Sequence, residues 1–66
     1  MKNVILNGET HTTDKTCVLD LLTEVGATQG RFAVEIDGML IPKSRLGDIV
    51  ISDGMSIEVV QAVGGG

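Results

Sequence analysis

The sequence contains few side chains that could act as nucleophiles or metal ligands, and each of them stands alone. Cys17 is the single cysteine and His11 the single histidine, which excludes an internal disulfide and any metal site built from several cysteines or histidines. A thiolate in the first turn of a helix would be reactive, but a small, partly buried side chain is the simpler interpretation of Cys17. His11 lies in a polar segment, and we expect it to be an exposed strand residue.

The most unusual feature of the sequence is its terminal stretch, Val63-Gly64-Gly65-Gly66. Glycine adds no packing and costs backbone entropy, so three of them do nothing to help a small domain fold. The stretch is not a phosphate-binding loop, because no Lys-Ser or Lys-Thr pair and no helix follows it. We expect residues 63–66 to form a flexible tail that becomes ordered only in complexes.

The composition describes one small domain, residues 1–66, without the features of nucleic-acid or membrane proteins. The chain has 66 residues, of which 42% are hydrophobic, and a net charge of −4. Its five basic residues are scattered, and it has one Phe and no Tyr or Trp, which argues against nucleic-acid binding. Short apolar runs and the lack of a signal-peptide pattern predict a cytoplasmic protein with no membrane span. So small a core cannot also enclose a substrate, which argues against an enzyme that works alone.

An apolar run followed by Asn-Gly predicts a β-hairpin at the start of the chain. Val4-Ile5-Leu6 precedes Asn7-Gly8, and Asn-Gly is the preferred pair for a two-residue type I′ turn. We expect strands over about 2–7 and 9–14. The second strand is polar and rich in Thr, which suits the edge of a sheet.

The apolar period then changes to that of a helix. Apolar residues recur at 18, 21, 22 and 25, the spacing of one helical face. Thr16 is the predicted N-cap, because its hydroxyl can accept a bond from a free N–H group. Gly26 fits the left-handed position that commonly follows the last turn of a helix.

The second half of the sequence predicts further strands separated by turns. Alternation predicts a strand over 32–37 with Phe32, Val34 and Ile36 on one face. An Asp-Gly turn leads to a short strand over 39–41, which Pro42 ends. Residues 43–53 are expected to be irregular, with a short helical turn near 44–48. A last strand is predicted over 55–62, and the glycine tail follows it.

This order, ββαβ(β)β, predicts an α+β fold with one helix on one face of a mixed sheet. The other face is then open to solvent. By alternation Ile5 and Val60 point to that open face, together with the alanines at 33 and 62. Such a shallow apolar patch is either a docking surface or a set of ordinary exposed aliphatic side chains.

Taken together, the motifs resemble the ThiS family, the sulfur carrier proteins of thiamine biosynthesis with a ubiquitin-like β-grasp fold. The matches run along nearly the whole chain: Val4-x-Leu6-Asn7-Gly8-Glu9, Thr16-x-Val18-x-x-Leu21-Leu22, Ala33-Val34-Glu35-Ile36, Ile41-Pro42-Lys43 and Ile57-Glu58-Val59-Val60-x-x-Val63-Gly64-Gly65-Gly66. Two positions depart from the family pattern: Asp37 stands where Asn is usual, and Met55 where Asp is usual.

The resemblance implies a protein co-substrate rather than an enzyme. A ThiF-type activating enzyme would use ATP to adenylate the carboxylate of Gly66, and a persulfide donor would convert it to a thiocarboxylate. A ThiG-type thiazole synthase would then receive the sulfur. Val63, Gly64 and Gly65 would thread the tail into these partners, and Ile5 and Val60 would help to dock it. The resemblance implies no cofactor or metal bound by the chain itself, since ATP belongs to the partner.

The sequence is also compatible with other functions of the same tail. A related carrier could serve molybdopterin, tungsten-cofactor or cysteine synthesis. A ubiquitin-like modifier would instead join Gly66 to lysines of other proteins. A plain interaction module would not need the tail at all.

Overall fold

A computed structural model describes residues 1–61 of the chain. Its first element is the predicted hairpin, formed by β1 (Lys2–Leu6) and β2 (Glu9–Thr13), which pair antiparallel. Asn7 and Gly8 both have positive φ, 51° and 83°, as a type I′ turn requires. The prediction of this turn is confirmed, and each strand ends one residue earlier than expected.

A second hairpin repeats the same turn chemistry. β3 (Phe32–Ile36) pairs antiparallel with β4 (Met39–Ile41), and the turn residues Asp37 and Gly38 have φ of 50° and 86°. Both hairpins therefore use a short polar residue followed by glycine, because few other residues accept the left-handed region without strain.

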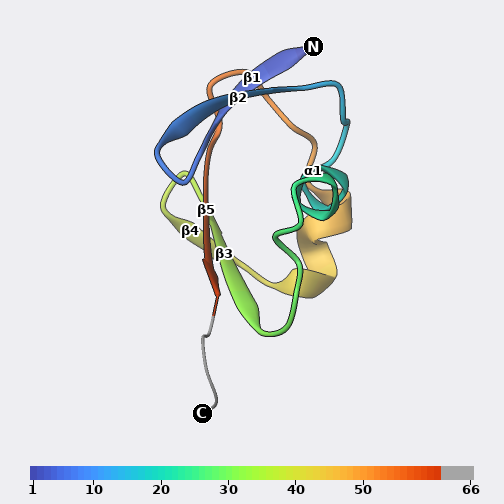
Figure 1. The fold of residues 1–66 in the computed structure, drawn as a ribbon, viewed down its shortest axis with the longest axis vertical. Coiled ribbons are helices and arrows are strands. Elements are labelled where there is room, and N and C mark those ends of the chain that lie inside the picture. Colours follow the sequence, from blue (N-terminus) through green and yellow to red (C-terminus); the bar gives the residue numbers. More distant parts are fainter. Residues whose placement is uncertain (62–66) are drawn as a thin grey trace.

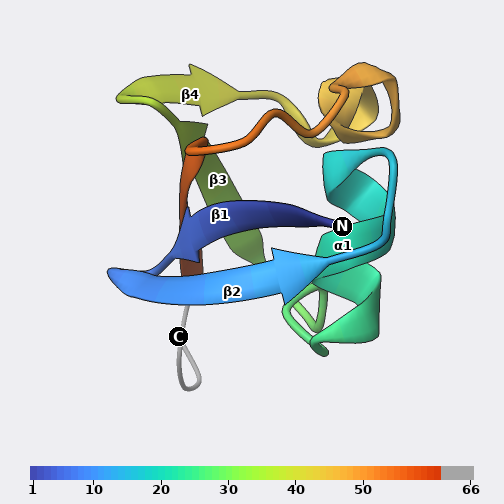
Figure 2. The same ribbon diagram turned by 90° about the horizontal axis from the view of Figure 1, so that it is seen from above.

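The last strand, β5 (Ser56–Gln61), joins the two hairpins into one sheet. The strand order is β2-β1-β5-β3-β4, with β5 parallel to β1 and antiparallel to β3. The sheet is therefore mixed, and the polar strand β2 lies at its edge, as predicted. Figure 2 shows β4 and β2 at opposite sides of the sheet, with α1 and the segment that follows β4 together on one face.

The helix α1 (Val18–Glu24) ends as predicted but begins differently. Gly26, with φ of 75°, donates to the Thr23 carbonyl at 3.2 Å, and Ala27 donates to the Leu22 carbonyl at 2.9 Å. These two bonds form a Schellman motif, which satisfies carbonyl groups of the last turn. Val25 lies beyond the last turn and is 38% exposed, so its prediction as part of the apolar face is wrong.

The predicted N-cap, Thr16, is wrong. Cys17 holds that position, just before the first helical turn rather than in it, and its side chain makes no capping bond. The helix start is instead tied to a distant segment: Val18 donates to the Ile49 carbonyl at 3.0 Å, and Ile51 donates to the Thr16 carbonyl at 2.8 Å. Backbone pairing with residues 49–51 therefore replaces a side-chain cap.

The segment after β4 holds the short 3₁₀ helix η1 (Lys43–Asp48), one residue longer than the predicted helical turn. Leu46 in η1 and Ile51 beyond it are buried, although the sequence analysis placed neither residue in the core. Figure 1 shows α1 and this segment covering the same face of the sheet.

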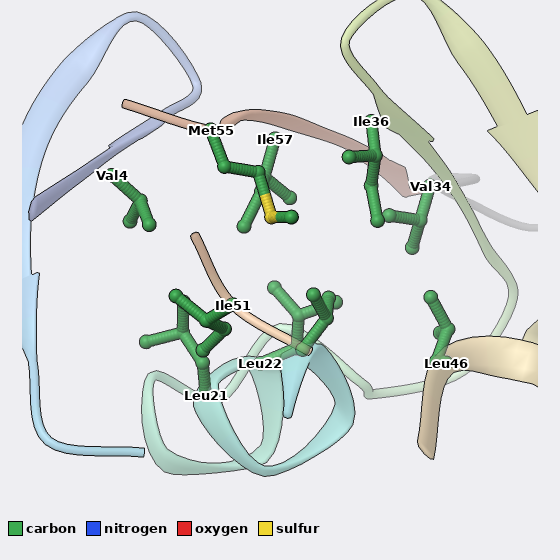
Figure 3. Packing of buried hydrophobic residues seen from close by; sticks show 10 residues of the cluster. Val4, Leu21, Leu22, Val34, Ile36, Leu46, Ile51, Met55 and Ile57 are labelled. Atoms are coloured by element: carbon green, nitrogen blue, oxygen red, sulfur yellow. The ribbon is translucent and has the colours of Figure 1, made fainter. Parts of the chain in front are cut away.

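The core lies between that face and the helical layer. Val4, Val34, Ile36 and Ile57 come from the strands, and Leu21, Leu22, Leu46 and Ile51 meet them from the other side (Figure 3). Phe32 and Val59 extend the cluster as half-buried residues, so the predicted inward face of both strands is confirmed. No helix within residues 1–61 has the length and hydropathy of a membrane span.

Candidate functional site

The strand that leads to the glycine tail is the central strand of the sheet. β5 lies between β1 and β3, and its last residue, Gln61, is paired with Phe32. The predicted site residues Val63, Gly64, Gly65 and Gly66, like Ala62, lie outside the described residues. The structure therefore describes the base from which the tail departs.

Two turn residues hold β5 from opposite sides. The Oδ1 atom of Asn7 accepts a hydrogen bond from the backbone N–H of Val59 at 2.8 Å, and the Oδ1 atom of Asp37 accepts one from Ser56 at 3.0 Å. Either Asn or Asp offers such an acceptor and tolerates positive φ, so Asp37 conserves the geometry of the usual Asn. The second departure, Met55, is buried and fills the core instead of forming a polar turn.

The face of the sheet that points away from α1 carries the predicted docking residues. Ile5 is 40% and Val60 is 65% exposed, which agrees with their predicted position on this open face. Strand register shows which side chains accompany them. We use the term open face for Ile5, Ala33, Glu35, Leu40, Glu58 and Val60.

A shallow hollow lies beside the end of β5, where Ala33 and Val60 of the open face meet Arg31 and Phe32. Its volume is about 300 Å³, and Arg31, Phe32, Ala33 and Val60 line it. The Lys43 ammonium lies 4.3 Å from the centroid of the Phe32 ring, a cation–π contact. The hollow is mainly apolar and is suited to receiving a side chain of another protein rather than to enclosing a small substrate.

A pair of carboxylates crosses the middle of the open face. Glu35 of β3 and Glu58 of β5 are direct register partners, and both are exposed. Leu40 of β4, 69% exposed, lies opposite Glu35 on its other side. Sequence reasoning missed this row, although alternation along each strand places all three on the outer face, because the register between strands was unknown.

The remaining candidates do not assemble into a catalytic site in the described part of the chain. Cys17 is half-buried and its backbone bridges to Val50, consistent with a structural role. His11 is half-buried rather than exposed, because it lies on the helix side of β2, as does its register partner Val4. Residues 1–61 contain no group of three potential metal ligands.

Comparison with known proteins identifies relatives with the same architecture. The family model described as "ThiS family" matches residues 4–66. A crystal structure of a thiamine biosynthesis protein (ThiS) from Geobacter metallireducens superposes with a TM-score of 0.79 and 26% identity, covering 97% of this chain and 99% of that one. A solution structure of a thiamine biosynthesis protein from the same organism gives a TM-score of 0.74, again with 26% identity, over 97% of this chain and 87% of the other.

A curated relative is much longer. It is a thiazole synthase from Paramagnetospirillum magneticum (strain ATCC 700264 / AMB-1), 31% identical over 64 residues. The match covers 96% of this chain but only 20% of that protein. The similarity thus concerns one segment of a larger polypeptide.

The predicted β-grasp architecture is confirmed by the five-stranded mixed sheet with its single α-helix and by the superposition on the two solved structures. The family model extends from β1 through the glycine stretch to Gly66. The chain therefore belongs to the ThiS family.

Proposed function

We propose that this chain is a sulfur carrier of thiamine biosynthesis that works through the carboxylate of Gly66. The observation that carries the proposal is the family match, which includes the terminal glycines and not only the folded part. The structural relatives are thiamine biosynthesis proteins, and the curated relative is a thiazole synthase, which points to thiazole formation as the client pathway.

The proposed chemistry begins with activation. A carboxylate is a poor electrophile, so a ThiF-type partner adenylates it: a carboxylate oxygen attacks the α-phosphorus of ATP, and pyrophosphate leaves. The terminal sulfur of a persulfide donor then attacks the acyl carbon, AMP leaves, and the product is an acyl disulfide with the donor. A thiol of the activating partner next attacks the donor sulfur, so that the S–S bond breaks, the thiocarboxylate is released, and the donor and the thiol are left joined as a disulfide. A ThiG-type thiazole synthase consumes the resulting thiocarboxylate. Adenylation consumes cellular ATP, so the proposal assigns the reaction to the cytoplasm.

The chain's own residues position the tail rather than catalyse a step. β5 is held on both sides by backbone pairing and by the side chains of Asn7 and Asp37. We assign to Val63, Gly64 and Gly65 the passage into each partner, because glycine has no Cβ to obstruct a narrow channel. Ile5 and Val60, exposed on the open face, would contact the partner while the tail is inside. In this role the chain is a co-substrate, and it needs neither a cofactor nor a metal of its own.

Intact-mass measurement tests the proposal directly. The chain is incubated with ATP, a cognate activating enzyme and a persulfide donor, beside a truncation that lacks Gly65 and Gly66. We expect a mass gain equal to exchanging one oxygen for sulfur, located at Gly66 and absent from the truncation. An unchanged mass in the presence of an active enzyme would refute the proposal, and adducts with lysines would indicate a modifier instead.

The contribution of the open face is tested by Val60→Asp. We expect slower adenylation, because a third carboxylate is placed in the apolar part of that face, while the circular dichroism spectrum and unfolding midpoint stay close to those of the parent chain. Unchanged activation kinetics would remove Val60 from the docking surface.

A further inference from the structure

The carboxylate pair Glu35 and Glu58 is unfavourable for the isolated domain. The two residues are register partners in antiparallel strands, where directly opposed side chains have Cβ atoms about 5 Å apart. Like charges in this arrangement destabilise a sheet. A residue pair that costs stability without contributing to the core is more simply explained by a role outside the fold.

No ion pair within residues 1–61 involves Glu35 or Glu58, although Arg31 lines the hollow one row away. The ion pairs of this part of the chain join Lys15 to Glu24 at 3.9 Å and Arg45 to Asp48 at 3.7 Å, away from Glu35 and Glu58. Glu24 belongs to α1, and Arg45 and Asp48 belong to η1, which Figure 2 shows together with α1 on the far side of the sheet. The two carboxylates are therefore exposed to solvent and lack a partner among the described side chains.

Aliphatic side chains flank the pair on two sides, and Ser56 is the next outward residue of β5 on the other. Leu40 lies opposite Glu35 in the same row, and Ala33 and Val60 form the next row towards the hollow. A protein that covers these aliphatic side chains must also remove water from both carboxylates. That desolvation is costly unless the partner supplies a positive charge at the same place. A planar guanidinium with several N–H donors is well suited to two carboxylates at this separation.

We propose that the open face docks on a thiazole synthase surface that presents an arginine or lysine between Glu35 and Glu58, ringed by apolar side chains that cover Leu40 and Val60. The proposal rests on the proposed carrier function. It commits to the synthase because a segment similar to this whole chain occurs within a longer protein named thiazole synthase. The net charge of −4 adds attraction towards a basic surface.

The test is titration calorimetry of the full chain with the purified cognate thiazole synthase. The variant is Glu35→Gln combined with Glu58→Gln, and the matched control is Glu9→Gln combined with Asp20→Asn. The control removes the same charge from exposed positions outside the open face, and thermal unfolding verifies that both variants fold. We expect Kd to rise at least about 10-fold for the variant and less than about twofold for the control. The variant should also lose most of the salt dependence of binding.

Three results would overturn the proposal. One is unchanged affinity of the double Gln variant. Another is equal weakening by variant and control, which would indicate only net charge. The last is slower adenylation with unchanged synthase binding, which would assign the face to the activating enzyme. Because the titration uses the unmodified chain, it is independent of sulfur transfer. Loss of synthase binding by the variant supports docking even if no thiocarboxylate forms, and that outcome would refute the carrier function alone.

Discussion

Replacing Asn7 should loosen the strand that leads to the tail. Asn7 combines three roles: it adopts a φ of 51°, its backbone N–H donates to the Ile57 carbonyl at 2.8 Å, and its side chain accepts the N–H of Val59 at 2.8 Å. Only the backbone bond survives in Asn7→Ala. The substitution removes the side-chain oxygen that accepts from Val59, and this bond holds β5 beyond Leu6, the last residue of β1.

The expected cost follows from these contacts. Loss of one side-chain hydrogen bond costs about 0.5–1.5 kcal/mol. Placing a residue with a Cβ but no local polar group in the left-handed region adds about 1–2 kcal/mol. We therefore expect Asn7→Ala to lower the free energy of unfolding by about 2–3 kcal/mol, which lowers Tm by about 10 °C or more in a domain of this size.

Two further substitutions separate the contribution of the side-chain hydrogen bond from that of the left-handed backbone conformation. Asn7→Gly keeps the backbone preference and removes the acceptor, so we expect a loss of about 1 kcal/mol. Asn7→Asp keeps both the acceptor oxygen and the tolerance of positive φ. Its free energy of unfolding should therefore stay within about 0.5 kcal/mol of that of the parent chain at moderate salt. Urea unfolding followed by far-ultraviolet circular dichroism suits a chain without Trp or Tyr. Equal stability of the Ala and Asp variants would refute this reasoning.

Three other perturbations test separate parts of the structure. Glu58→Gln should raise the free energy of unfolding by about 0.2–1 kcal/mol at low salt, because it removes the charge opposite Glu35, and a gain that does not shrink at high salt would contradict this origin. Leu46→Ala should cost about 2–5 kcal/mol in urea unfolding, since the side chain is fully buried, and a cost below 1 kcal/mol would show that η1 is not part of the core. Gly26→Ala should cost about 1 kcal/mol at a φ of 75°, although no atom lies within 4 Å of the added Cβ, and a more stable variant would argue against the Schellman motif.

The sequence predicted the elements whose signals are local. Asn7-Gly8 and Asp37-Gly38 marked the two hairpins because type I′ turns demand residues that accept positive φ. Gly26 marked the end of α1 for the same reason. Alternation in the last strand correctly separated the buried Ile57 from the exposed Val60. These features depend on a few neighbouring residues, so they can be recognised without the fold.

Other features depended on partners far along the chain. The start of α1 is secured by backbone bonds to residues 49–51, so a side-chain cap was the wrong expectation. Leu46 and Ile51 are part of the core because η1 packs beside α1. Their own segment has no regular apolar period, so the sequence pattern did not predict their burial. Half-burial of His11 likewise reflects the face of β2 and not the polarity of its neighbours.

By itself the sequence determined the order of elements, the turns, the inward and outward faces of the strands, and the membership in a family whose pattern includes the glycine stretch. Tertiary structure alone decided how the last strand joins the two hairpins. Placing β5 between β1 and β3 set the register that brings Glu35 opposite Glu58 and surrounds them with Leu40 and Val60. Alternation assigns a residue to a face, but only pairing between distant strands places two residues side by side on it.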